Sequence, residues 1–590
     1  MFKKERFNPY KVGELRPHQL ITTFGPGAIH DAVKDSVTIL DIPYWQETGK
    51  IITDGRLASY FGVTHFRSPR TTNGWDLPTI SFPHFHVCSK STCNRLFDIR
   101  NDKFDRDIYL KQGPTCPDCG FKAFPARFVM ACKDGHLDDF PWSWWVHRGK
   151  SDCSGKLKLY STGLTSTLSE IMVECECGEK RSMAGALDKE EFLNKGYKCT
   201  GHHPHRPSEK DKRCSCDEIY PAQRGASNIY FPVIRSAISI PPWTNPLYIM
   251  LDEQYVLIKQ MQELGVVDAI DKVFEKYFAP SFNRAEFDKA LRAREEKIKE
   301  FTEIKEMEYK SFINHATLDY KKDYKYFKAA EENVPIYLIK YFGRLIKIER
   351  LREVVVLQGF MRIDPPEPEA DTLGKMVKLT KTKDSWLPGV EINGEGIFIE
   401  FNKEAVAKWL ALPTVKVLSA KYKTLFAEYC KGRNWENVKE RDAQYVLLHT
   451  FAHLMIKEMS LLSGYSTTAI KERVYSSETM CGVLFYTGSS DKEGSLGGLV
   501  ELGSEENFKK ILKAALENSL LCTTDPECTN SEIDANTLNG SACHSCCMIS
   551  ETACENGNRL LDRSFIAPLD GKEVNSFFKE LIEELCGIVL

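Results

Sequence analysis

Long apolar stretches are what this chain of 590 residues lacks most clearly, and their absence limits where the protein can work. No run of about 18 apolar residues occurs, so we expect no transmembrane helix and no membrane partner. The opening residues, MFKKERFNPYKVGELRP, contain no apolar core of the kind that secretion signals carry. The formal net charge is only −3, which excludes a polycationic coat for nucleic acid. We therefore expect a cytoplasmic protein.

Two motifs that would assign an activity are also missing. A phosphate-binding loop needs Gly-x4-Gly-Lys-Ser/Thr, and the nearest match, Gly149-Lys150-Ser151, has Trp144 where the first glycine belongs. His449 and His453 have the spacing of a metalloprotease helix, but Thr450 replaces the general-base glutamate. On such an apolar helix, we expect the two histidines to be buried and hydrogen-bonded within the protein. The sequence therefore predicts a protein without catalytic residues.

Cysteine, by contrast, is abundant, with 20 in the chain. Eleven lie between Cys88 and Cys216 and six lie between Cys522 and Cys554, whereas the remaining three are isolated. In a reducing compartment, clustered cysteines are metal ligands far more often than they are disulfides. A Cys-x2-Cys turn can aim two thiolates at one tetrahedral zinc ion. We therefore predict roughly three to four zinc ions per chain.

The first block of cysteines predicts three zinc sites. Two paired-thiol turns about 23 residues apart match the zinc-ribbon pattern and form the first site. The second combines a Cys-x3-His pair with a His-x5-Cys pair, and the third combines a Cys-x-Cys pair with two later cysteines. The predicted ligands are Cys88, Cys93, Cys116 and Cys119 for the first site; Cys132, His136, His147 and Cys153 for the second; and Cys175, Cys177, Cys199 and Cys214 for the third. Cys216 is an alternative to Cys214, and the three histidines that follow Cys199 could compete as ligands.

The second block predicts a fourth site near the end of the chain. Cys543 and Cys546 form a Cys-x2-Cys turn, and Cys554 follows eight residues after Cys546. We take Cys528 as the fourth ligand, with Cys522 as the alternative. Four protein ligands close a zinc shell and leave no position for water, so these sites are predicted to hold structure rather than to hydrolyse a substrate.

Residue patterns predict a multidomain α+β protein in five segments. Residues 1–85 carry turns and short strands, and the Cys/His-rich residues 86–225 are typical of zinc-ribbon and zinc-knuckle modules. Residues 226–350 contain an extended stretch and then a helical region, with apolar residues three and four apart. Residues 351–440 return to strands, and residues 441–590 form a C-terminal α/β zinc-binding domain.

Stretches from one end of the chain to the other resemble one protein family. They include RPHQLITTFGPGAI (16–29), CKDGHLDDFPW (132–142), LREVVVLQGFMRI (351–363), LLHTFAHLMIKEMSLLSGYS (447–466) and CHSCCMISETACENGNRLLDR (543–563). These stretches resemble the DrmB family, the helicase-partner subunits of the DISARM anti-phage defence system. The C-terminal part also resembles the zinc-binding domain of Mrf-type superfamily 2 DNA helicases, in which the motor is on the same chain.

This resemblance implies that the ATPase motor is on a separate chain, because no motor motif is found in this sequence. It implies a non-catalytic zinc-binding subunit that associates with a separate DrmA-type superfamily 2 helicase, and through it with single-stranded or end-containing DNA. We expect basic residues beside the zinc modules to contact phosphate, namely Arg206, Arg213 and Arg559. The alternative is a free-standing zinc-dependent nucleic-acid-binding protein, but a pI near 6.6 is low for that class.

Overall fold

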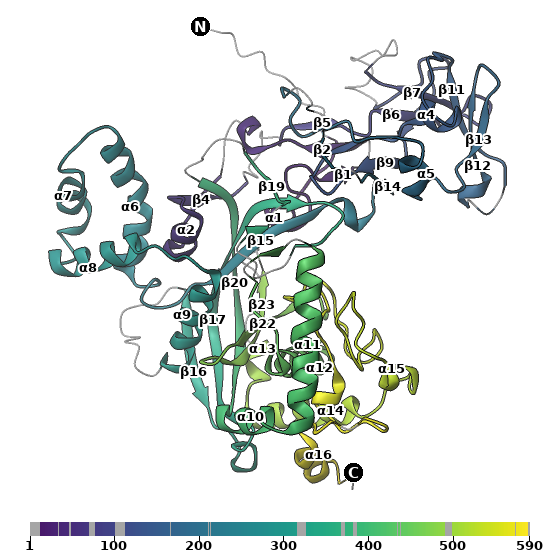
Figure 1. Ribbon diagram of the computed structural model, residues 1–590. Coiled ribbons are helices and arrows are strands. Elements are labelled where there is room, and N and C mark those ends of the chain that lie inside the picture. The colour runs from purple at the N-terminus through teal and green to yellow at the C-terminus, as the bar shows by residue number, and fades with distance from the viewer. Residues whose placement is uncertain are drawn as a thin grey trace.

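A nine-stranded sheet forms the centre of the molecule (Figure 1). The computed structural model describes residues 12–587 except 33–34, 46–48, 70–76, 101–112, 164, 166, 210–211, 213, 217, 316–325, 367–371, 374, 381–385, 434, 437, 490–497 and 573. The main antiparallel strands of the sheet follow the order β15 (Phe231–Ile238), β17 (Phe342–Met361), β20 (Trp386–Phe401), β23 (Cys481–Ser489) and β22 (Ile470–Ser476). Four further strands attach to these, namely β16 (Phe327–Glu332) and β19 (Val377–Lys378) on β17, β4 (His65–Arg67) on β20, and β3 (Ile51–Ile52) on β4.

The two longest strands, β17 and β20, are buried on both faces. They span 20 and 16 residues, and each contains a continuous run of buried residues, 351–357 in β17 and 394–399 in β20. Successive side chains of a strand point to opposite faces of its sheet. Ile397 and Ile399 accordingly enter the core beneath the C-terminal helices, whereas Phe398 enters the core on the other side. A continuous run of buried residues in a strand requires cover on both faces of the sheet.

Helices from the C-terminal part of the chain cover one face. They are α10 (Lys403–Leu410), α11 (Pro413–Gly432), α12 (Ala443–Ser463), α13 (Gly498–Glu501), α14 (Glu505–Ser519) and α16 (Lys579–Cys586), with the short turns α15 (Glu527–Asn530) and η7 (Arg563–Phe565) nearby. α12 is apolar on nearly all sides and lies between the sheet and the C-terminal loops. It begins after the capping residue Asp442 and ends at Gly464, which has a left-handed backbone (φ 74°).

The opposite face of the sheet is covered by α9 (Phe301–Ile313), whose Tyr309 and Phe312 pack against Phe398. Before it, α6 (Pro246–Glu263), α7 (Ala269–Val273), a π-helical turn (Phe274–Phe278) and α8 (Arg284–Glu295) form a helical projection with a small core of its own. Figure 1 shows this projection standing out from the sheet beside α2 (Gly55–Phe61). A buried ion pair between Arg294 and Asp252, 2.7 Å long, joins α8 to α6.

Small sheets, formed mostly by the cysteine-rich residues, lie at one end of the central sheet. A six-stranded sheet has the order β13 (Lys180–Ser182), β12 (Ile171–Cys175), β11 (Leu157–Ser161), β7 (Arg95–Asp98), β6 (Phe85–Cys88) and β8 (Ala123–Pro125). Two three-stranded sheets are β10 (Leu137–Asp139), β9 (Phe128–Ala131) and β14 (Tyr220–Gln223), and β1 (Ile29–Asp31), β2 (Ser36–Ile39) and β5 (Thr79–Ser81). The strands β18 (Thr372–Leu373) and β21 (Trp435–Glu436) form a separate two-stranded ladder. The remaining short helices are α1 (Pro17–Thr22), α4 (Trp142–Val146), α5 (Glu190–Leu193), η1 (Ile42–Tyr44), η2 (Leu168–Glu170), η3 (Ser227–Ile229) and η6 (Ile336–Leu338).

One buried arginine ties the small sheets to the central sheet. Arg362 directly follows β17, and its guanidinium donates to the backbone carbonyls of Gly135, Ile229 and Gly27 at 3.0, 2.6 and 2.9 Å. Burial lowers the pKa of Arg362 to about 10. Because Gly135 lies in the hairpin between β9 and β10, the end of the longest strand is fastened to the cysteine-rich part.

The mixed α/β class with cysteine clusters, helices and a C-terminal zinc-binding domain is confirmed. The central sheet, however, takes strands from four of the five expected segments, since β3 and β4 come from residues 1–85 and β22 and β23 from residues 441–590. The expected boundaries therefore cut through one sheet, and the division into folding units stays a prediction. Among the described helices, none combines the length and apolarity needed to cross a membrane.

Candidate metal centres

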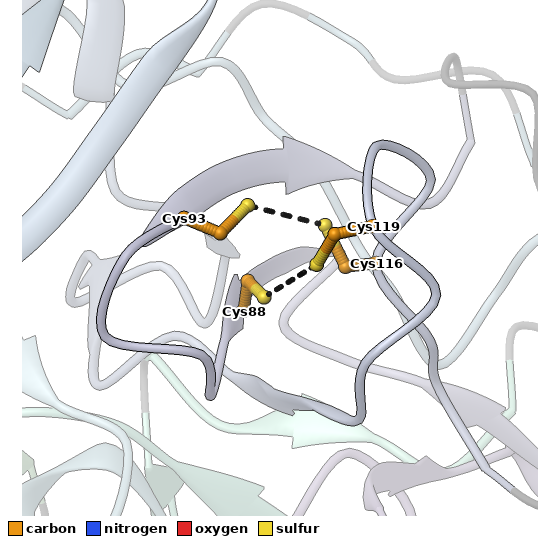
Figure 2. A group of neighbouring side chains, drawn as sticks. All are labelled: Cys88, Cys93, Cys116 and Cys119. Carbon is orange, nitrogen blue, oxygen red and sulfur yellow. Dashed lines mark hydrogen bonds between the residues drawn. The ribbon is translucent and has the colours of Figure 1, made fainter.

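The first cysteine cluster is a tetrad of Cys88, Cys93, Cys116 and Cys119 (Figure 2). Cys88 ends β6, Cys93 lies in the turn before β7, and the other two belong to a turn before β8. Cys88 and Cys119 have their sulfurs 3.4 Å apart, and those of Cys93 and Cys116 are 3.8 Å apart. Sulfurs around one tetrahedral zinc lie about 3.8 Å apart, whereas a disulfide requires about 2.05 Å. The structure thus brings together the four residues expected for the first site, in a geometry that suits a metal ion.

The second cluster contains Cys132, His136, Cys199 and Cys214. The Cys132 sulfur lies 3.2 Å from His136 Nδ1 and 3.9 Å from the Cys214 sulfur. The side-chain hydrogen bond from Cys199, followed by the nearby His136, lowers the pKa of Cys132 to about 4, although burial opposes this. A thiol that ionises readily is suited to metal binding, because the thiolate is the ligand. Cys216, the alternative to Cys214, has its sulfur 2.9 Å from that of Cys214 and borders the cluster.

The third cluster contains His147, Cys153, Cys175 and Cys177. His147 Nε2 lies 3.3 Å from the Cys177 sulfur, and the sulfurs of Cys153 and Cys175 are 3.6 Å apart. The Nδ1 of His147 donates to the carbonyl of Ser143 at 2.7 Å, which leaves the Nε2 lone pair facing the sulfurs. The backbone N–H of Glu179 and then His147 lower the pKa of the exposed Cys177 to about 7.

These two clusters divide their ligands differently from the sequence-based expectation. The sequence placed His147 and Cys153 with Cys132, because they follow it closely along the chain. It placed Cys199 and Cys214 with the Cys175–Cys177 turn, whereas the structure groups both with Cys132. Strand pairing decides otherwise: β11 pairs with β12 so that Leu157 faces Cys175, which carries the preceding Cys153 to the Cys175–Cys177 turn. In the same way, β14 pairs with β9, and the chain leading into β14 brings Cys214 to the β9–β10 hairpin.

The fourth cluster contains Cys522, Cys528, Cys543 and Cys546. Its sulfur–sulfur distances are 3.4 Å for Cys522–Cys543, 3.7 Å for Cys528–Cys546 and 3.8 Å for Cys543–Cys546. Both alternatives for the fourth ligand are therefore present in one tetrad. Cys554, which the sequence assigned to this site, lies elsewhere, with its sulfur 3.2 Å from His449 Nε2 in a buried group with His453 and Glu472.

A buried arginine stands beside the fourth cluster. The Arg563 guanidinium lies 3.6 Å from the Cys528 sulfur and 3.1 Å from Asp525, and it donates to the carbonyls of Ser519 and Ser541. Burial acts to lower the pKa of Arg563, but the surrounding thiols and Asp525 outweigh it and raise the pKa. A zinc ion with four thiolates carries a formal charge of −2, so a buried cation next to it offsets part of that charge.

The arginines expected to contact DNA have internal partners. Arg206 is buried, forms an ion pair with Asp41 and donates to the carbonyl of Lys378. Arg559 is also buried, and it donates to Asn556 and to the hydroxyl of Tyr429 at 2.9 Å. Both guanidinium groups are thus held inside the fold, which does not support a role in phosphate binding. Arg213 lies outside the described residues.

Sequence reasoning missed one group of ligand-type side chains. It treated His449 and His453 as ordinary buried histidines, and it gave no role to Glu472. The i, i+4 spacing of the two histidines was a usable signal, because that spacing places both imidazoles on one face of a helix. No comparable signal pointed to Glu472, which reaches the histidines only through the packing of α12 on β22.

Two protein-family models match this chain, one in its N-terminal part and one in its C-terminal part. Residues 16–231, which contain the first three clusters, match a domain of unknown function, DUF8724. Residues 451–547, which contain the fourth cluster, match the MrfA Zn-binding domain. Together with the geometry of the clusters, this match shows that the chain contains sites able to bind zinc, as expected.

Comparison with individual proteins extends over nearly the whole chain. A DISARM protein DrmB of Bacillus paralicheniformis is 45% identical over 573 residues, which are 94% of this chain and 100% of that protein. Among solved structures, a crystal structure of the DUF1998 helicase MrfA bound to DNA aligns with 44% of this chain and 24% of its own, at 10% identity. Its TM-score of 0.19 is too low to support an argument about fold.

Proposed function

This chain belongs to the DrmB family of DISARM proteins, and from that premise we propose that it is a non-catalytic, zinc-binding subunit in anti-phage defence. Its partner is a DrmA-type superfamily 2 helicase on a separate chain. The two proteins together bind and translocate along DNA, with this subunit supplying a zinc-stabilised scaffold and the helicase supplying ATP hydrolysis.

The observation that carries the proposal is a helicase-type zinc-binding domain in a sequence without a phosphate-binding loop. Each of the four cysteine clusters described above offers four protein ligands. A zinc ion held by four protein ligands has no open position for a substrate or a water molecule. Such centres are suited to hold a scaffold in shape, and a motor on another chain must then provide the work.

Contact with DNA is assigned to the complex rather than to this chain alone. The net charge of −3 and the internal bonds of Arg206 and Arg559 speak against a strong phosphate-binding surface on the subunit. A channel shared with a translocating helicase suits single-stranded or end-containing DNA, because such channels follow the backbone of one strand.

Co-purification is the direct test of this proposal. A tagged copy of the chain is expressed together with a DrmA-type superfamily 2 helicase and isolated at moderate salt. We expect the helicase in stoichiometric amount, and DNA-stimulated ATP hydrolysis that is present in the complex and absent from the subunit alone. If the subunit purifies alone and binds DNA by itself with a steep salt dependence, the free-standing nucleic-acid-binding protein is the better description.

A matched pair of variants connects the zinc domain to this assembly. Cys546→Ser removes a ligand of the fourth cluster, whereas Cys547→Ala changes the neighbouring buried cysteine, which is not in the tetrad. We expect the first variant to lose zinc and recover little helicase, and the second to recover it at the wild-type level. Equal recovery by both variants would show that the zinc domain is not needed for assembly.

A further inference from the structure

Close to the fourth cluster lies a second buried group of ligand-type side chains, formed by His449, His453, Glu472 and Cys554. The histidines lie one turn apart on α12, Glu472 lies on β22, and Cys554 lies in the loop that follows the C-terminal tetrad. All four residues are buried, and their donor atoms lie within 4.8 Å of one another. Three separate parts of the chain therefore converge at this point.

The two imidazoles present their Nε2 atoms to the centre of the group. His453 Nδ1 donates to the carbonyl of Cys547 at 2.9 Å, and His449 Nδ1 donates to the carbonyl of Leu560 at 3.4 Å. A metal-binding histidine almost always donates its other N–H to a carbonyl or carboxylate, which fixes the tautomer and directs the free lone pair at the ion. Both histidines here have that arrangement.

Glu472 brings negative charge to the same point. Its Oε1 lies 2.8 Å from His449 Nε2 and 3.3 Å from His453 Nε2. Three lone-pair atoms cannot approach so closely unless a positive charge lies among them, either a proton or a metal ion. The other carboxylate oxygen, Oε2, is buried and has no hydrogen-bond partner. A buried carboxylate oxygen without a partner is costly, and a metal ion would satisfy it.

Cys554 completes the donor set. Its sulfur accepts hydrogen bonds from the backbone N–H groups of Asn556 and Asn558, at 3.3 and 3.2 Å. The first and fourth clusters show the same feature, since the N–H groups of Lys90 and Cys543 donate to the sulfurs of Cys88 and Cys546. Backbone N–H groups aimed at a sulfur favour its thiolate form. The loop after Cys554 is thus built in the same way as the turns of the cysteine tetrads.

We propose that these four side chains bind a structural zinc ion, separate from the one assigned to the C-terminal cysteine tetrad. Two neutral imidazoles, one carboxylate and one thiolate balance the two positive charges of the ion, and this mixture of N, O and S donors suits zinc better than magnesium or calcium. Donor atoms around a tetrahedral zinc lie about 3.3–3.8 Å apart. The side chains therefore move apart by a few tenths of an ångström when the ion enters.

The position of the site gives the ion a mechanical role. It fastens the loop that carries Cys554 to α12 and to β22, and so joins the zinc-binding domain to the central sheet. His449 and Cys554 lie outside the residues that match the MrfA Zn-binding domain, whereas His453 and Glu472 lie inside them. The ion is thus a link between that domain and the parts of the chain on either side of it.

Zinc-edge anomalous diffraction from crystals of the full-length wild-type protein tests the site without any substitution. We expect an anomalous peak among His449 Nε2, His453 Nε2, Glu472 and the Cys554 sulfur, in addition to the peak at the C-terminal tetrad. A peak at the tetrad without one at this site would overturn the proposal and leave a buried histidine–glutamate pair. This result does not depend on whether the helicase partnership is correct.

Metal analysis of variants gives a second, independent readout. Cys554→Ala and Glu472→Gln are each expected to lose one equivalent of zinc per folded chain, and Cys554→Ala combined with Cys546→Ser is expected to lose two. His315→Ala is the control, because His315 is buried and hydrogen-bonded to a carbonyl but belongs to none of the clusters described. Retention of the full zinc content by both Cys554→Ala and Glu472→Gln would contradict the assignment.

Discussion

Different interactions are expected to stabilise the cysteine-rich region (residues 77–225) and the central sheet. Strands of the cysteine-rich region are three to five residues long, whereas β17 and β20 span 20 and 16 residues. The region has a compact core around Trp142 and Trp145, and it carries three of the four cysteine clusters. The central sheet instead packs against a much larger core on one face and against a second core around Phe398 on the other. Metal ligands are concentrated where strands are too short to bury much apolar surface, because an ion replaces part of a core.

The C-terminal tetrad is an intermediate case. Cys528 and Cys546 belong both to the tetrad and to the large core that contains α12. A metal site attached to a large core is expected to hold the local loops in place, whereas the sites of the cysteine-rich region are expected to maintain the fold of that whole region. Removal of zinc, of single ligands or of neighbouring charges is therefore expected to affect the two regions differently.

The largest effect is expected from removal of zinc. A strong chelator should unfold the cysteine-rich region and leave the central sheet intact. Structural zinc contributes an apparent binding free energy of about 10–16 kcal/mol at neutral pH, comparable to the whole stability of a domain, which is about 5–15 kcal/mol. Hydrogen–deuterium exchange should show loss of protection in β6 to β13 while β17 and β20 remain protected. Simultaneous loss in both regions would break the contrast.

The next-largest difference between the regions is expected from substitution of single metal ligands. Cys116→Ser is expected to remove one zinc and to expose most of β6, β7 and β8 to proteolysis, because the tetrad connects these strands. Cys546→Ser is expected to release only the loops after α14, since α12 keeps its packing on the sheet. Limited proteolysis with mass spectrometry distinguishes the two patterns. Cys481→Ala serves as the control, because Cys481 is a buried cysteine of β23 outside the clusters described.

Removal of a charge next to a tetrad should also cost different amounts of stability in the two regions. Arg563 is fully buried beside the fourth cluster, so Arg563→Ala is expected to cost about 3–5 kcal/mol in the free energy of unfolding. Lys156 is largely exposed and pairs with Asp118 next to the first cluster, so Lys156→Ala is expected to cost about 0–1 kcal/mol. Urea unfolding of the two variants and the wild type measures both values. Equal costs would show that burial does not set the strength of these contacts.

A further effect is a pH dependence located in the sheet. Burial, and then the charge of Arg67, lower the pKa of His65 on β4 from 6.5 to about 4. The unfolded chain therefore binds a proton at a higher pH than the folded one, and His65 stabilises the fold fully only above about pH 6.5. As the pH falls from 6.5 to 4, this contribution declines by up to about 1.4 kcal/mol per pH unit.

The difference between wild-type and His65→Gln proteins isolates that contribution from other acid effects, including loss of zinc. Unfolding free energies are measured for both proteins between pH 4 and pH 7.5. The wild-type curve is expected to have the steeper slope in this range. Parallel curves would show that His65 takes up its proton equally well in the folded and unfolded chains.

Much of the metal chemistry was predictable from local spacing. The two cysteines of each Cys-x2-Cys turn, Cys116–Cys119 and Cys543–Cys546, lie in the same cluster, because two intervening residues place both thiols close enough to bind one ion. The expected assignment failed to match the structure where a cluster joins distant segments. His147 and Cys153 lie with Cys175 rather than with Cys132, and Cys554 lies with His449 rather than with Cys546.

Residues and their spacing were enough to predict the ligand types, the family and the main strands of the central sheet, since all of these depend on neighbouring residues or on residue patterns. Which pairs of ligands share a cluster could not be predicted in this way, because it depends on the three-dimensional fold. The register between β11 and β12 and the packing of α12 on β22 set those partners. The ligands of one metal ion must lie within a few ångströms of one another. Strand pairing and helix packing bring such residues together even when they lie far apart in the chain.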